Sequence, residues 1–187
     1  NFNWQHTMNP RAMTESTEHK VAIQITLSGR VQGIGLRPAV ARRARELRLA
    51  GSICNTTEGI ELQIEGAEKV VQEFERDLET YLPDETVIDQ KSSEVIKPRG
   101  GTRFDIIEKQ TSGPLAARIP PDIAVCPDCL AEVADPADQR FGYAFTSCTS
   151  CGPRYSLLRS MPYERGQTGM SKYVLCSHCQ REYDSPV

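Results

Sequence analysis

The sequence lacks both a long apolar run and an excess of charge of one sign. No apolar stretch in its 187 residues approaches the length of a signal-peptide core or a membrane span. The formal net charge of −3 gives no general attraction to nucleic acid or to an anionic membrane. Charged residues make up 25% of the chain, which is close to the globular average and argues against a disordered protein. We therefore expect a soluble, cytoplasmic protein without a membrane or nucleic-acid partner, built as one domain or two small ones.

Histidine is scarce, but cysteine is abundant and paired. The chain has three histidines and seven cysteines, and six of the cysteines form Cys-x-x-Cys pairs. The pairs are Cys126/Cys129, Cys148/Cys151 and Cys176/Cys179. Two such pairs can place four thiolates on one tetrahedral metal ion, whereas a redox pair needs a thioredoxin-like βαβ setting that this segment lacks. The 18 residues between the first two pairs predict a closed, structural zinc site, with iron in a rubredoxin-like site as the minor alternative.

The cysteine pairs belong to an internal repeat with a period of 50 residues. The matching positions are Cys126 and Cys176, Glu132 and Glu182, and Pro136 and Pro186. A fixed period indicates a duplicated unit. The first unit continues to Cys148 and Cys151, whose equivalents near residues 198 and 201 would follow Val187, so we expect the second unit to be cut short. Two pairings stay open, because the first pair can share a zinc with the second or with the third.

Hydrophobic periodicity divides the chain before the cysteines. Residues 1–19 are polar and aperiodic, and we assign them no fold or function. Strand patterns at residues 21–27, 53–55, 60–64, 86–96 and 102–107 alternate with helical patterns at 36–47 and 67–78. This order predicts an α+β domain with the ferredoxin-like βαββαβ arrangement over residues 20–109, including a turn at 98–101. A linker at 110–123 and a zinc-finger region at 124–187, which needs metal to fold, complete the expected organisation.

A glycine-rich loop joins the first expected strand to the first helix. It reads Gly29-Arg-Val-Gln-Gly-Ile-Gly-Leu-Arg37, with three glycines where backbone amides can turn toward a ligand. Such a nest at the positive end of a helix is typical of anion sites. Arg37, in the first helical turn, can clamp a phosphoryl group with two parallel hydrogen bonds. The competing interpretation is an ordinary loop followed by a solvated arginine.

Two motifs resemble the acylphosphatase family. Gly29–Arg37 resembles its signature Gly-Arg-Val-Gln-Gly-Val-x-Phe-Arg, with Ile34 and Leu36 as conservative departures, and Gly51–Gly59 is similar to its second motif, Gly-x-Val-x-Asn before a turn glycine. The resemblance implies that Arg37 binds the substrate phosphate and that Asn55 orients the attacking water, with no protein general base. It also implies that backbone amides of the loop bind the phosphate, at Val31, Gln32, Gly33, Ile34, Gly35 and Leu36.

The combination with cysteine pairs resembles the N-terminal part of the HypF family, the carbamoyltransferases that mature [NiFe]-hydrogenases. Segments Asp135–Arg140, Cys148–Arg154 and Tyr163–Met170 carry this resemblance. It implies that carbamoyl phosphate is the substrate, and that this part hydrolyses it to carbamate and phosphate. It further implies that ATP binding and carbamoyl transfer to a HypE-type partner, for cyanide-ligand synthesis, belong to domains beyond Val187.

Two other interpretations are consistent with parts of the sequence. The first is a zinc-ribbon module that binds protein or nucleic acid on a catalytically inactive ferredoxin-like domain, with Arg154, Arg159 and Arg165 as a modest basic patch; a solvated face is the plainer interpretation of those arginines. The second is a stand-alone acylphosphatase. The cysteine-rich segment argues against it, because acyl phosphate hydrolysis needs no metal.

Overall fold

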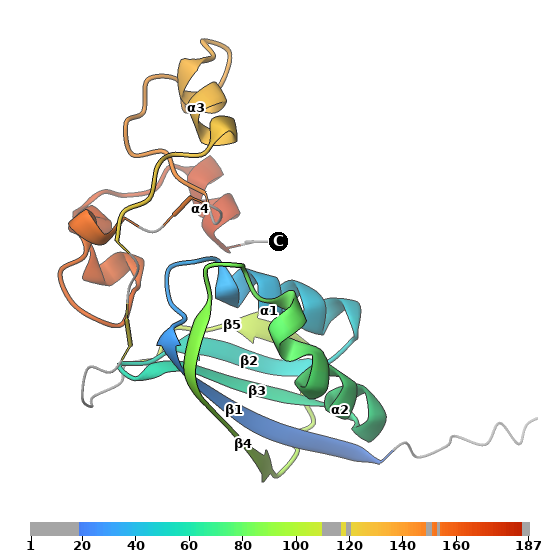
Figure 1. The fold of residues 1–187 in the computed structure, drawn as a ribbon. Helices are drawn as coiled ribbons and strands as arrows, with labels where there is room; N and C mark the ends of the chain where they lie inside the picture. The colour runs from blue at the N-terminus through green and yellow to red at the C-terminus, as the bar shows by residue number, and fades with distance from the viewer. Residues whose placement is uncertain (1–18, 110–116, 119–120, 149–150, 153, 185–187) are drawn as a thin grey trace, which may run out of the picture.

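A computed structural model describes residues 19–109, 117–118, 121–148, 151–152 and 154–184 (Figure 1). The predicted order of elements is confirmed in its first part, where the two extended stretches expected at 86–96 and 102–107 form two separate strands. The elements are β1 (Lys20–Arg30), α1 (Leu36–Glu46), β2 (Ala50–Asn55), β3 (Gly59–Ala67), α2 (Glu68–Asp77), β4 (Val87–Ile96), β5 (Phe104–Ile106), α3 (Pro127–Ala134) and α4 (Ser177–Asp184). Short 3-10 turns follow α2 at Leu78–Tyr81 and occupy Tyr155–Leu157, Arg165–Gln167 and Gly169–Lys172.

The sheet has the strand order β4-β1-β3-β2-β5. β1 pairs with β3 and β4, and β3 pairs with β2, in each case antiparallel, whereas β5 joins β2 in parallel. α1 and α2 lie on the same face of the sheet (Figure 1). This is the ferredoxin-like α+β arrangement that the sequence predicts.

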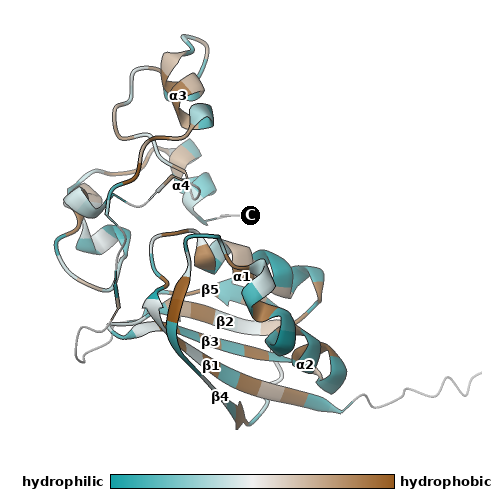
Figure 2. Cartoon of the chain, viewed as in Figure 1, coloured by the Kyte–Doolittle hydropathy of each residue, from teal (hydrophilic) through white to brown (hydrophobic). Residues whose placement is uncertain are grey.

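The sheet and the two helices enclose one apolar core. Apolar and polar bands alternate along the strands (Figure 2), because successive side chains point to opposite faces. Ile25, Leu27, Leu62 and Phe74 are completely buried between the sheet and the helices. Burying each side chain of this size contributes about 1.5–3 kcal/mol, so this core supplies much of the folding free energy of this part.

The segment expected as a turn at residues 98–101 connects two strands that do not pair. β4 and β5 lie at opposite edges of the sheet. The buried carboxylate of Glu65 on β3 accepts hydrogen bonds from the backbone amides of Arg99, at 2.6 Å, and Gly100, at 2.8 Å. Because these bonds hold the connection near β3, the chain crosses to the far edge and adds β5 beside β2.

The cysteine-rich region is irregular apart from its short helices. α3 and α4 have the same length and lie 50 residues apart, at 127–134 and 177–184, as the sequence repeat predicts. The region lies near the end of the sheet where β1 leads into α1 (Figure 1). Among the described residues, no helix combines the length and apolar character needed to cross a membrane.

Candidate functional site

The loop between β1 and α1 turns tightly on two glycines. Gly33 and Gly35 have φ values of 73° and 77°, a left-handed conformation that residues with a Cβ rarely adopt. Around them, four loop side chains are buried in the domain. These are Val31, Gln32, Ile34 and Leu36, each at most 5% exposed. Because the side chains point into the domain, the loop can offer a ligand its backbone at the N-terminus of α1.

Gln32 ties this loop to the turn between β2 and β3. Its side chain is 1% exposed, and its Nε2 donates to the backbone oxygens of Thr56, at 2.7 Å, and Gly59, at 2.6 Å. Asn55, the last residue of β2, precedes that turn. Gln32 therefore fixes the distance between the loop and Asn55, a structural role for its side chain that sequence reasoning did not assign.

Arg37 and Asn55 converge on one backbone oxygen. The carbonyl of Tyr163 accepts a hydrogen bond from Asn55 Nδ2 at 2.8 Å and a longer one from Arg37 Nη2 at 3.4 Å. Asn55 is 1% exposed, and its Oδ1 is buried without a hydrogen-bond partner among the residues that the structure describes. The two side chains that the acylphosphatase resemblance implies as catalytic thus lie at one point, and one amide oxygen there can still accept a hydrogen bond.

Arg37 and Asn55 contact residues of the cysteine-rich region. The sequence did not predict this contact. Glu164 Oε1 lies 2.6 Å from Arg37 Nη1, and the Tyr163 amide donates to Gln32 Oε1 at 2.8 Å. The sequence singled out residues 163–170 only as part of a family resemblance. No local pattern links Glu164 to a residue 127 positions earlier, so the fold alone reveals this contact.

Burial raises the pKa values of two neighbouring side chains, Tyr163 and Glu164. Desolvation raises the pKa of the Glu164 carboxyl, which is 8% exposed, and the nearby Arg37 guanidinium offsets only part of that rise. Desolvation likewise raises the pKa of the Tyr163 hydroxyl, although its hydrogen bond with the Arg154 backbone opposes the change. The Arg37–Glu164 ion pair therefore lies in a largely desolvated setting, where charge–charge interactions are stronger than in water.

Four cysteine sulfurs form a compact group. The Sγ atoms of Cys126, Cys129, Cys148 and Cys151 all lie within 4.8 Å of one another. Individual separations are 3.6 Å for Cys126–Cys148, 3.9 Å for Cys148–Cys151 and 3.8 Å for Cys129–Cys151. A zinc ion with four Zn–S bonds of about 2.3 Å separates its sulfurs by about 3.8 Å, so the donor set fits tetrahedral zinc.

The positions of the cysteines favour one of the two pairings that the sequence left open. The first and second Cys-x-x-Cys pairs come together, whereas Cys176 and Cys179 lie outside the group, at the start of α4. Cys179 donates its backbone amide to Cys176 Sγ at 3.5 Å. The neighbouring-pair interpretation therefore agrees with the described residues, and the interleaved one does not.

Hydrogen bonds shift the pKa of one thiol in the four-sulfur group downward. Burial opposes ionisation of Cys151, but backbone hydrogen bonds at Cys126 and Cys148 and the Arg154 side chain lower the pKa of Cys151 to about 6. Burial and the neighbouring sulfurs raise the pKa of Cys129. Four sulfurs this close repel one another once ionised, so a divalent cation is what allows all four to bind as thiolates.

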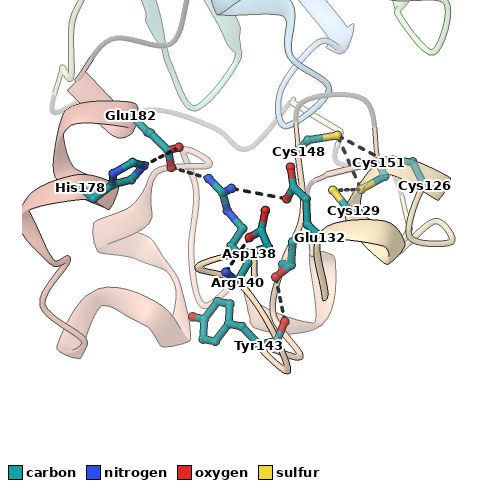
Figure 3. A network of polar contacts seen from close by, with 11 residues as sticks. Cys126, Cys129, Glu132, Asp138, Arg140, Tyr143, Cys148, Cys151, His178 and Glu182 are labelled. Carbon is teal, nitrogen blue, oxygen red and sulfur yellow. Dashed lines mark hydrogen bonds and ion pairs between the residues drawn. The ribbon is translucent and has the colours of Figure 1, made fainter. Parts of the chain in front are cut away.

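Arg140 joins the two units of the repeat (Figure 3). Its guanidinium forms an ion pair with Glu132 of α3, at 3.5 Å, and another with Glu182 of α4. Glu182 also contacts His178 Nε2 at 3.1 Å, and its hydrogen bond with Arg140 lowers the pKa of its carboxyl. The two glutamates occupy equivalent positions in the repeat, so one arginine holds both helices.

Two of the three arginines of the possible basic patch make contacts inside the region. Arg154 donates to the backbone oxygen of Cys151, and Arg165 Nη2 donates to the backbone oxygen of Tyr173 at 2.8 Å. Since these guanidinium groups take part in internal contacts, they favour a structural interpretation over a surface for nucleic acid.

Comparisons with known proteins agree with this geometry. Residues 23–106 match the acylphosphatase family, and residues 125–158 match the HypF finger. An acylphosphatase from Bacillus subtilis (strain 168) is 34% identical over 85 residues, which are 45% of this chain and 93% of that protein. The carbamoyltransferase HypF of Synechocystis sp. is 40% identical over 153 residues, which are 82% of this chain and 20% of that protein.

A solved structure gives the same result. The crystal structure of full-length HypF in the phosphate- and nucleotide-bound form is 36% identical, with a TM-score of 0.80 over 88% of this chain and 22% of that one. This chain spans about a fifth of the length of the curated carbamoyltransferases that it matches. The chain therefore belongs to the acylphosphatase family through residues 23–106, and joins that domain to a HypF finger as the HypF carbamoyltransferases do.

Proposed function

We propose that this chain hydrolyses carbamoyl phosphate to carbamate and phosphate, as the first step of a carbamoyl transfer. The observation that carries the proposal is the convergence of Arg37 and Asn55 beside the glycine loop. Arg37 binds the phosphoryl oxygens, and the loop amides from Val31 to Leu36 surround them at the N-terminus of α1. Such a site supplies the positioning and positive charge on which phosphoryl transfer depends.

Asn55 positions the water. Its Nδ2 is held by the Tyr163 carbonyl, which leaves the buried Oδ1 as an acceptor for a water proton. The water oxygen attacks phosphorus, the bond from phosphorus to the carbamoyl oxygen breaks, and carbamate leaves with the electron pair. A phosphate oxygen takes the water's proton, so no protein base is required.

The cysteine-rich region serves this reaction as a scaffold. Cys126, Cys129, Cys148 and Cys151 would hold one zinc ion, whose contribution is to fix the fold of the region. Cys176 and Cys179 would bind a second ion with ligands supplied from elsewhere. The reduced thiols that such a site needs support a cytoplasmic location.

The remaining steps require more protein than this chain. We propose that activation of carbamate with ATP, transfer to a HypE-type partner and synthesis of hydrogenase cyanide ligands take place in the full-length carbamoyltransferase. The similarity to carbamoyltransferases over a fifth of their length supports this assignment.

Release of inorganic phosphate from carbamoyl phosphate tests the proposed function. Asn55→Ala should lower kcat by roughly 10²-fold with a small change in KM, because a misplaced water lowers the rate of attack more than the binding of substrate. Ser52→Ala, on the same strand, is the matched control and should retain full activity. Equal rates for the native chain and the Asn55→Ala variant would remove Asn55 from the mechanism.

A further inference from the structure

A carboxylate already occupies the guanidinium that the proposed function assigns to the substrate phosphate. Glu164 Oε1 lies 2.6 Å from Arg37 Nη1, and Glu164 is 8% exposed. The contact crosses between two parts of the chain, because Arg37 opens α1 and Glu164 follows the cysteine group in sequence. Any phosphoryl group bound at Arg37 must therefore share that guanidinium with Glu164 or displace it.

The position of Glu164 is built into the fold through its neighbour Tyr163. The Tyr163 amide donates to Gln32 Oε1 at 2.8 Å, and its carbonyl accepts from Asn55 Nδ2 at 2.8 Å. Gln32 is itself held by two backbone oxygens of the β2–β3 turn. Both bonds use the peptide groups of Tyr163, so the docked Tyr163 backbone holds the Glu164 side chain at Arg37.

The same segment is connected to the cysteine group. The Tyr163 hydroxyl accepts a hydrogen bond from the Arg154 backbone amide at 3.1 Å, and the Arg154 side chain donates to the backbone oxygen of Cys151. A continuous series of contacts thus runs from the four-sulfur group to Arg37. Docking of the finger region and occupancy of the anion site therefore share one set of residues.

Two anions cannot both use one guanidinium edge in a desolvated site without strong repulsion. We propose that Glu164 is an internal competitor that fills the phosphate position of the acylphosphatase site and must leave Arg37 before an acyl phosphate binds. This inference rests on the proposed function for the identity of the substrate, but not for the competition itself. Docking of the Tyr163–Glu164 segment weakens phosphate binding at Arg37 by some factor. By thermodynamic linkage, bound phosphate must weaken the docking of that segment by the same factor.

Binding of inorganic phosphate to the full chain, measured by titration calorimetry, tests the competition without requiring catalysis. Glu164→Gln should bind phosphate about 10-fold more tightly than the native chain, within the usual range of such couplings. Glu58→Gln removes a charge from an exposed side chain in the nearby turn and should leave the dissociation constant unchanged. An unchanged constant in Glu164→Gln, or no phosphate binding to either protein, overturns the proposal.

Hydrogen exchange of the native chain supplies a second measurement that needs no variant. Saturating phosphate should speed exchange at the amides of residues 164–168, and unchanged exchange there overturns the coupling.

Hydrolysis is followed separately to distinguish the two proposals. If Glu164→Gln binds phosphate more tightly while neither protein hydrolyses carbamoyl phosphate, the competitor stands and the proposed function fails. If the native chain hydrolyses carbamoyl phosphate and Glu164→Gln binds phosphate no more tightly, the reverse holds.

Discussion

Replacement of Arg37 by alanine should lower kcat/KM for carbamoyl phosphate by about 10³-fold, the upper range for loss of one preorganised donor to a developing negative charge. Arg37 places two guanidinium nitrogens at the point where Asn55 and the loop meet. Arg37→Lys keeps the charge but not the planar fork, so it should recover only a small part of the activity. Phosphate release at several substrate concentrations measures both variants.

The Arg37 experiment needs two controls, because the arginine also neutralises a buried carboxylate. Arg42→Ala removes an exposed arginine from the same helix and should leave kcat/KM unchanged. The double variant Arg37→Ala/Glu164→Gln removes the unpaired charge and restores any stability lost through it, but should remain inactive. Recovery of activity in the double variant would show that Arg37 acts only by balancing Glu164.

Replacement of Cys151 by serine should abolish zinc binding at the four-cysteine group and unfold the finger region. A structural zinc ion contributes an apparent binding free energy of about 10–16 kcal/mol at neutral pH. The region around α3 has little buried apolar surface that could replace this contribution. The acylphosphatase part has its own core and should stay folded. Zinc content by atomic emission and hydrogen exchange across both parts measure these outcomes.

Cys54→Ala is the matched control for the zinc experiment. Cys54 is buried in β2, away from the sulfur group, and burial raises the pKa of its thiol. Its replacement should leave the zinc content unchanged. A Cys151→Ser protein that still holds one zinc in this group, with protected amides in α3, would contradict the assignment of these four ligands.

Local patterns were sufficient to predict the elements that form the sheet domain. Alternation at residues 21–27 marks β1, and helical spacing from Leu36 marks α1, because each pattern depends on neighbours a few positions away. The edge position of β5 depends on Glu65 binding amides more than 30 residues later, and no local signal carries that information.

The candidate site also combines features that short motifs predict with a contact that depends on the tertiary structure. The glycine loop, Arg37 and Asn55 were identified from short motifs, and the fold brings them together around the Gln32 side chain. The Arg37–Glu164 contact joins residues 127 positions apart and depends on how two parts of the chain dock. Prediction of such a pair requires the tertiary structure, since a glutamate in an irregular segment has no distinguishing pattern of its own.

The shared arginine of the repeat changes how the duplication should be understood. Glu132 and Glu182 are equivalent residues, yet both take their counter-ion from Arg140, which belongs to the first copy. Glu182 of the second copy therefore pairs with an arginine of the first copy. Because the same guanidinium serves both glutamates, a substitution of Arg140 should disturb α3 and α4 together.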